Sequence, residues 1–195
     1  MTRLEEAAKG PATGVVTAYF SLGSNLGDRE ANIRRACMEM AASGLLAEMA
    51  VSSLYETEPW GPVPQGPYLN CVVAGRTAAS PQDLLHMAQS IEASMGRVRD
   101  VRWGPRIIDI DILLLGGLRL RRPELEIPHP RMWERAFVLV PLAELCPTLP
   151  SPGGEELRSF VKRLPDLATV RRLDVDMRGV FGELQNSVPG GVAGC

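Results

Sequence analysis

Two aspartates separated by one residue are the strongest sign of chemistry in this sequence. Asp109 and Asp111 alternate with isoleucines in the run Ile-Asp-Ile-Asp-Ile-Leu-Leu-Leu (108–115). Alternation with a period of two predicts a β-strand, on which the aspartates share one face. The opposite face would carry four apolar residues: Ile108, Ile110, Ile112 and Leu114. Adjacent carboxylates repel and raise each other's pKa unless a cation lies between them, so the pair predicts a site for a divalent cation such as Mg²⁺.

A group of arginines stands immediately upstream of this strand. It comprises Arg97, Arg99, Arg102 and Arg106, with Trp103 among them. Guanidinium groups bind phosphate oxygens through paired hydrogen bonds, and protein-bound Mg²⁺ is usually held by one or two carboxylates together with substrate phosphates. The segment therefore predicts a site for a magnesium-bound phosphate compound. The alternative is a half-exposed strand with solvated aspartates that follows a basic surface loop.

The whole chain has the composition of a single domain. It has 195 residues, of which 45% are hydrophobic, so it can bury a sizeable core. The net charge of −2 gives no reason to expect a nucleic acid or an anionic membrane as partner. Four cysteines, far apart in the sequence, and only two histidines point away from a zinc site and towards a reducing compartment. Without an apolar run that could serve as a signal peptide or membrane span, the protein is expected to be cytoplasmic.

Hydrophobic periodicity predicts alternating strands and helices over the first 115 residues. The strands are expected at 15–22, 47–56, 68–77 and 108–115, with helices at about 29–44 and 81–95. This order is that of the ferredoxin-like α+β sandwich, in which right-handed crossovers place both helices on one face of the sheet. The isoleucines of the last strand should then face the helices, and Asp109 and Asp111 should face the open side.

The flanking regions give weaker signals. The Gly23–Asp28 turn could cradle a phosphate, but it lacks the Lys-Ser/Thr of a P-loop, so helix capping is the preferred interpretation. After residue 115 the sequence indicates a short outer strand pair, an apolar run at Phe137-Val-Leu-Val that follows a short helical turn, and a helix at 155–164. We expect residues 1–14 to form a loose extension, 15–165 the functional domain, and 166–195 a weakly ordered tail.

Six short motifs occur in one order along the chain and carry a family resemblance. They are Gly-Ser-Asn-Leu-Gly (23–27), Tyr-x-Thr-x-Pro-x-Gly (55–61), Tyr-Leu-Asn (68–70), Arg-Trp-Gly-Pro-Arg-x-x-Asp-x-Asp (102–111), Ile-Pro-His-Pro (127–130) and Arg-Ala-Phe (135–137). With them, residues 15 to about 165 resemble the 6-hydroxymethyl-7,8-dihydropterin pyrophosphokinases of folate synthesis. The resemblance implies transfer of diphosphate from ATP to the pterin, release of AMP, and a ferredoxin-like fold with an additional C-terminal hairpin and helices.

The resemblance also implies roles for individual residues. Asp109 and Asp111 would hold two Mg²⁺ ions, and Arg97 and Arg106 would stabilise charge on the moving diphosphate. The implied ATP contacts are Gln89, Glu92, Arg99, Arg102, Trp103, Ile112, His129 and Arg135. The implied pterin contacts are Thr57, Glu58, Trp60, Tyr68, Asn70, Trp103 and Phe137. The family further implies a monomer whose partners are ATP and the pterin, with neither nucleic acid nor membrane.

Some features depart from the family, and two other classes of function stay open. Glu124 and Glu126 stand where some members place basic or hydroxyl contacts to the nucleotide, which weakens that part of the expected ATP site. A ferredoxin-like sheet with a basic loop can bind RNA, although this one presents aspartates where base-stacking aromatics would be needed. A structural or regulatory module with solvated aspartates is the other alternative. Binding of Mg²⁺-ATP would separate the enzyme from both.

Overall fold

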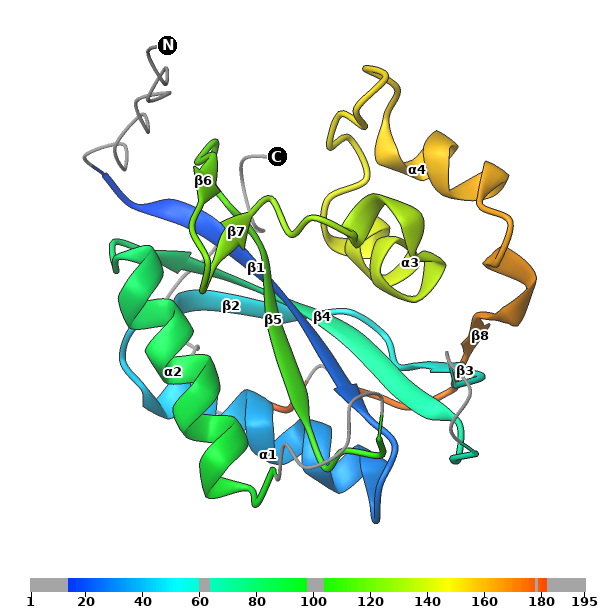
Figure 1. Ribbon diagram of the computed structural model, residues 1–195, viewed down its shortest axis with the longest axis horizontal. Helices are drawn as coiled ribbons and strands as arrows, with labels where there is room; N and C mark the ends of the chain where they lie inside the picture. Colours follow the sequence, from blue (N-terminus) through cyan, green and yellow to red (C-terminus); the bar gives the residue numbers. More distant parts are fainter. Residues whose placement is uncertain (1–13, 60–63, 98–103, 178, 182–195) are drawn as a thin grey trace, which may run out of the picture.

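A mixed α/β architecture with an antiparallel central sheet is seen in the computed structural model, which describes residues 14–59, 64–97, 104–177 and 179–181 (Figure 1). The strand order of the sheet is β5-β1-β4-β3-β8, and β2 also pairs with β4. Its strands are β1 (Val16–Ser24), β2 (Ala47–Val51), β3 (Tyr55–Thr57), β4 (Tyr68–Thr77), β5 (Asp109–Leu115) and β8 (Arg171–Arg172). A separate two-stranded sheet joins β6 (Leu120–Arg121) to β7 (Glu126–Ile127), which confirms the predicted outer strand pair.

Two long helices, α1 (Arg29–Ala42) and α2 (Pro81–Ser94), cover one face of the sheet (Figure 1). The Asp28 side chain caps α1, and Ser80 and Asp83 form a reciprocal capping box at the start of α2. Gly96 follows α2 with a φ of 83°, a left-handed conformation that glycine adopts without steric cost. The predicted helices are therefore confirmed, and their apolar stripes bury the main core.

The other face of the sheet is covered only in part. Helix α3 (Ala136–Leu145) packs on β4, and α4 (Leu157–Phe160) packs on α3 (Figure 1). Three short 3₁₀ helices flank them: η1 (Met132–Glu134), η2 (Val161–Arg163) and η3 (Leu167–Thr169). The apolar run that begins at Phe137 is the first part of α3, and the helix expected at 155–164 is shorter than predicted, since α4 is followed directly by η2.

The strand predicted at 47–56 is two strands with a break at Ser52. The Ser52 hydroxyl is buried and accepts a hydrogen bond from the backbone N–H of Val72 at 3.0 Å. A side-chain oxygen thus takes a place that a backbone carbonyl would hold in a regular ladder. Strand β3 begins three residues later and pairs with the first residues of β4, next to the pocket described below.

The face assigned to Leu114 was wrong, because a β-bulge interrupts the alternation in β5. Tyr19 of β1 pairs with Leu114 and Phe20 pairs with Ile112, so Leu113 is the additional residue. Ile108, Ile110 and Ile112 pack with the core under α1 and α2, as predicted. Leu113 and Leu114 pack instead with the cluster under α3.

The described part of the segment expected to be a weakly ordered tail is packed against the domain. Strand β8 pairs with β3, and the N–H of Leu173 donates to the carbonyl of Leu54 at 2.9 Å. Three side chains beyond it belong to the main core: Met177, Val180 and Phe181. The packed structure therefore extends past the domain boundary expected at residue 165. The expectations for residues 1–13 and 182–195 lie outside the described residues.

Candidate active site

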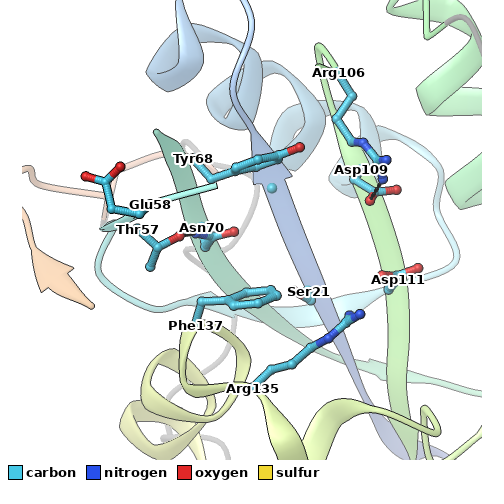
Figure 2. Close-up of a pocket in the computed structure, with 11 residues that line it drawn as sticks. Ser21, Thr57, Glu58, Tyr68, Asn70, Arg106, Asp109, Asp111, Arg135 and Phe137 are labelled. Carbon is cyan, nitrogen blue, oxygen red and sulfur yellow. Dashed lines mark hydrogen bonds and ion pairs between the residues drawn. The ribbon is translucent and has the colours of Figure 1, made fainter. Parts of the chain in front are cut away.

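A pocket opens on the partly covered face of the sheet, at the end where β1 finishes and β4 and β5 begin (Figure 2). Its lining comes from β1, β3, β4, β5 and the start of α3. The lining residues are Ser21, Gly23, Thr57, Glu58, Tyr68, Asn70, Arg106, Asp109, Asp111, Arg135 and Phe137. Nine of these eleven were predicted site residues, which come together from sequence positions 57 to 137.

The two aspartates lie on the pocket side of β5, as the alternation predicted. Ile110, between them, is 5% exposed and packs under the helices. The side chains of Asp109 and Asp111 are 23% and 46% exposed and face the pocket (Figure 2). The strand therefore divides into an apolar face that stabilises the fold and an acidic face that is available for chemistry.

Asp109 is bound by two arginines. Arg97 lies 2.6 Å from one carboxylate oxygen and Arg106 lies 2.5 Å from the other. The Gly-Ser-Asn turn positions Arg106 through two hydrogen bonds with Asn25. The backbone N–H of Arg106 donates to the side-chain oxygen of Asn25 at 2.8 Å, and the backbone N–H of Asn25 donates to the carbonyl of Arg106 at 3.1 Å. In the described structure this turn thus holds the loop before β5, which favours a structural role over a phosphate cradle.

Asp111 is in a different electrostatic situation. Within the described part of the chain, no arginine or lysine forms an ion pair with it, and its closest basic group is His129 Nε2 at 3.9 Å. The pKa of Asp111 is raised to about 6 by desolvation and by the charges of Asp109 and Glu92. Burial and nearby arginines lower the pKa of His129 to about 4, so the imidazole is neutral at pH 7 and does not compensate the carboxylate.

These carboxylates fit a divalent cation whose remaining ligands come from elsewhere. Asp111 forms no ion pair with an arginine or lysine among the described residues, and Asp109 shares its side of the strand. The described residues contain no cluster of three or more acidic, histidine or cysteine side chains that could enclose a metal. A pair of carboxylates without further protein ligands is typical of Mg²⁺ sites that are completed by water and substrate phosphates.

The opposite half of the pocket is walled by aromatic rings. The rings of Tyr68 and Phe137 lie on two sides of the space, with Asn70 between them in the view of Figure 2. Asn70 is 3% exposed, and its amide NH₂ donates to the Thr57 hydroxyl at 2.9 Å, which fixes the orientation of the amide. Such a slot can hold a flat heterocycle and offer hydrogen bonds at one edge.

The aromatic wall is held by contacts from distant parts of the chain. Phe137 is in the first turn of α3, and the carboxylate of Asp166 accepts a hydrogen bond at 3.0 Å from the N–H of Ala136, so it caps this helix from 30 residues away. The guanidinium of Arg135 lies 5.5 Å from the Phe137 ring centroid, a cation–π distance. Arg135 and Phe137 therefore line the pocket side by side, in contact with each other.

Several predicted site residues are not in the pocket lining. Gln89 is exposed on α2, Glu92 is buried, and the side chain of Ile112 is 4% exposed on the opposite face of β5, so this side chain does not line the pocket. Arg97 does not line the pocket, but it forms an ion pair with the lining residue Asp109. Arg99, Arg102, Trp103 and Trp60 lie outside the described residues.

Two lining residues, Ser21 and Gly23, were missed. They occupy alternate positions of β1 on the pocket face. A Cβ at position 23 would come within 3.2 Å of the Asn70 side-chain oxygen, so the glycine leaves room for that amide. The signal that could have found them is the change from Tyr19 to Ser and Gly at alternate positions of one strand face, which marks the end of its apolar cover.

Comparison with known proteins gives consistent matches. Residues 19–147 match the family described as 7,8-dihydro-6-hydroxymethylpterin-pyrophosphokinase (HPPK). A Bacillus subtilis protein named 2-amino-4-hydroxy-6-hydroxymethyldihydropteridine pyrophosphokinase is 47% identical over 129 residues, which cover 66% of this chain and 77% of the relative. A Methylorubrum extorquens protein of the same name is 45% identical over 157 residues, 80% of this chain and 98% of the relative.

A solved structure supports the fold. The wild-type Plasmodium falciparum HPPK-DHPS with pteroate superposes with a TM-score of 0.60 at 17% sequence identity and covers 82% of this chain. The present chain spans 43% of that longer one. At this identity the likeness concerns the arrangement of the backbone alone.

Proposed function

The chain belongs to the 7,8-dihydro-6-hydroxymethylpterin-pyrophosphokinase family, and we propose that it transfers diphosphate from ATP to the hydroxymethyl group of 6-hydroxymethyl-7,8-dihydropterin. The hydroxyl oxygen attacks the β-phosphorus of ATP, the bond between the α–β bridging oxygen and the β-phosphorus breaks, and AMP leaves with the bridging oxygen. The pterin diphosphate is an intermediate of tetrahydrofolate synthesis. The observation that carries this proposal is a single pocket with an aromatic slot at one side and an arginine–aspartate cluster at the other.

In the proposed site, Asp109 and Asp111 would hold two Mg²⁺ ions. Bound Mg²⁺ would neutralise phosphate charge and bring the acceptor hydroxyl and the β-phosphorus together. Arg97 and Arg106 now bind Asp109, and both guanidinium groups can exchange the carboxylate for phosphate oxygens when ATP is present. The exchange would release Asp109 for the cation and place two positive charges on the moving diphosphate.

The other proposed ATP contacts surround this cluster. His129 is neutral at pH 7, so it can hydrogen-bond to ribose or phosphate without adding charge. Arg135 is placed to bind phosphate across the pocket from Asp109 (Figure 2). The proposal also keeps five further nucleotide contacts that the resemblance implies: Gln89, Arg99, Arg102, Trp103 and Ile112. Glu92, which the resemblance implies as well, is buried and bound to Ile110 and Arg97, so it is not proposed as a direct nucleotide contact.

In the aromatic half, Tyr68 and Phe137 would stack on the two faces of the pterin. Asn70, oriented by Thr57, would read the amide-like edge of the ring, since an oriented amide presents one donor side and one acceptor side. Glu58 lines the same half, and Trp60 and Trp103 are further proposed pterin contacts. Stacking of a flat heterocycle between aromatic rings excludes water and fixes the hydroxymethyl group towards the aspartates.

We also propose that the fold is the ferredoxin-like α+β sandwich with an additional hairpin and helices. The order β5-β1-β4-β2/β3 and the location of α1 and α2 on one face support this assignment. The catalytic domain would begin near residue 15 and extend past residue 165, since β8 and later residues pack against it. The protein would be a cytoplasmic monomer that acts on small molecules. In the described residues, no helix is both long and apolar enough to cross a membrane.

The deciding experiment is incubation of the protein with ATP, Mg²⁺ and the hydroxymethyl dihydropterin, followed by identification of the nucleotide product. Attack on the β-phosphorus yields AMP in equal amount to pterin diphosphate. Pterin-dependent formation of ADP would mean transfer of a single phosphate and would refute the proposal. Omission of the pterin is the control, since hydrolysis of ATP alone would then be visible.

A further inference from the structure

Glu92 is a buried carboxylate that lies beneath the pocket. It stands in the last turn of α2, and its side chain is only 5% exposed. A buried charge is tolerated only where it is paired and hydrogen-bonded, so the partners of Glu92 identify what it holds in place.

The described partners of Glu92 are the strand that carries the aspartates and an arginine of the site. Its Oε1 atom accepts a hydrogen bond at 2.8 Å from the backbone N–H of Ile110, the residue between the two aspartates. The same oxygen forms an ion pair with Arg97, and Arg97 also reaches Asp109 at 2.6 Å. Glu92 therefore connects α2, the catalytic strand and a proposed phosphate-binding arginine.

We propose that Glu92 is a positioning residue whose negative charge fixes the guanidinium of Arg97 beside the aspartates. This inference rests on the proposed role of Arg97 in binding the diphosphate. An arginine has five N–H donors in a rigid fork, so a carboxylate beneath it can fix the group and leave other donors directed towards phosphate. The Arg97 side chain is 15% exposed, which fits an arginine held from below.

The negative charge of Glu92 also affects how strongly Arg97 binds Asp109. Arg97 is shared between the carboxylates of Glu92 and Asp109. Without the charge at Glu92, the guanidinium would interact more strongly with Asp109, and this interaction would compete with both phosphate and cation. The hydrogen bond to Ile110, in contrast, needs only an oxygen acceptor. The two functions of Glu92 can therefore be separated by changing charge without changing shape.

The variants Glu92→Gln and Glu92→Ala separate the effect of the Glu92 charge from that of its hydrogen bond to Ile110. The Ala variant leaves the Ile110 N–H without its acceptor and should lower the melting temperature by several degrees. The Gln variant keeps an oxygen that can accept the hydrogen bond from Ile110. It also removes a carboxylate whose pKa is raised by burial, which means that its charged form is costly in this position. The melting temperature of this variant should therefore stay close to that of the wild type. Its turnover at saturating substrates should nevertheless fall by about tenfold or more, with pterin affinity unchanged within about twofold.

A double-mutant cycle tests whether Glu92 acts through Arg97. If it does, Glu92→Gln combined with Arg97→Ala should turn over no more than about twofold slower than Arg97→Ala alone. Full multiplication of the two defects would mean that Glu92 acts elsewhere, for example on the nucleotide, and would overturn the inference. Wild-type turnover from the Gln variant would also overturn it, because the carboxylate would then be only a hydrogen-bond acceptor.

A matched control is available on α1. Glu39→Gln removes a surface ion pair with Arg35 at 2.8 Å but keeps an oxygen that can accept the hydrogen bond from the Ser94 hydroxyl. This variant should alter neither melting temperature nor turnover. Identification of AMP from the wild-type protein is measured separately. A failure of the cycle in an enzyme that makes AMP therefore refutes the role of Glu92 and leaves the proposed function standing.

Discussion

The two faces of the central sheet are built from the same strands but differ in what covers them. On the face under α1 and α2, apolar residues alternate along most of the length of β1, β4 and β5. On the other face they are apolar only under α3. Beyond that helix, β1 changes from Tyr19 to Ser21 and Gly23, β4 from Val72 to Asn70, and β5 from Leu114 to the aspartates.

This difference shows how one sheet can carry a core and a catalytic surface. The polar residues of all three strands lie at the same end, because β1 is antiparallel to both β4 and β5. The position at which a strand face turns from apolar to polar therefore marks the edge of the covering helix. At that edge, Phe137 in the first turn of α3 forms a wall of the pocket.

The largest expected effect comes from a polar residue on the fully covered face. Ile110→Asn should lower the free energy of unfolding by roughly 3–5 kcal/mol, because it removes apolar packing and leaves an amide without partners in the core. Thermal and denaturant unfolding measure the loss. A variant that melts like the wild type would show that this face is not the structural one.

On the open face, loss of charge should affect catalysis before stability. Asp109→Asn and Asp111→Asn keep the size of the side chain, so each should still fold. Each should reduce turnover by two orders of magnitude or more, about 2.7 kcal/mol in the barrier, because metal-bound charge is used most in the transition state. Steady-state kinetics and melting curves are compared with those of Ile110→Asn, and unfolding by either aspartate variant would reverse the assignment of the faces.

The pocket wall should contribute to one substrate only. Phe137→Ala removes one aromatic face of the proposed slot and should weaken pterin binding by about 1–3 kcal/mol. ATP affinity should hardly change, since the nucleotide is assigned to the other half. Titration calorimetry with each ligand measures both, and a loss confined to ATP would place the aromatic slot in the wrong half of the site.

The smallest expected effect is a difference in stability between the variants of the two aspartates. The pKa of Asp111 is raised from 3.8 to about 6 on folding, so its ionisation costs stability as the pH rises from about 4 to 6, and the cost stays above pH 6. In metal-free buffer, Asp111→Asn should therefore be stabilised relative to the wild type above pH 6 and equal to it near pH 4. Since 46% of the side chain is exposed, solvent limits the difference to less than about 1 kcal/mol.

Asp109→Asn is the control for this measurement. Asp109 is bound by Arg97 and Arg106, so the amide leaves two guanidinium groups without their carboxylate. Relative to the wild type, this variant should lose stability, because the loss of two ion pairs outweighs the weaker repulsion on Asp111. Unfolding in chelator at several pH values compares both variants, and equal behaviour of the two would contradict the different environments of the carboxylates.

Local sequence patterns were sufficient for much of the fold and for most of the pocket. Strict alternation in β5 predicted the faces of Asp109 and Ile110, and hydrophobic periodicity predicted both long helices. The errors arose where an interaction distant in sequence overrides local preference. Leu114 changes face because one more residue is accommodated opposite β1, and the strand at 47–56 breaks where Ser52 bonds to Val72.

The site residues that were missed, or that do not line the pocket, follow the same rule. Gly23 matters because of the Asn70 amide that lies against it, which cannot be inferred from the neighbours of Gly23 in sequence. Glu92 was expected beside the nucleotide, as the resemblance implies, yet its described partners are the backbone of β5 and Arg97. A polar residue on a helix flank looks the same in sequence whether its neighbour is solvent or a strand.

The cap that Asp166 provides for α3 affects the order in which parts of the structure can form while the chain is synthesised. The catalytic strand and both core helices are complete by residue 115, so they can fold early while the chain is still being made. The aromatic wall receives its capping carboxylate only after a further 30 residues beyond Ala136 have been added. The proposed slot for the heterocycle is thus completed late. A prematurely released chain that ends before residue 166 would keep its acidic strand but lack the cap that holds the proposed pterin wall, together with β8 and the later core residues.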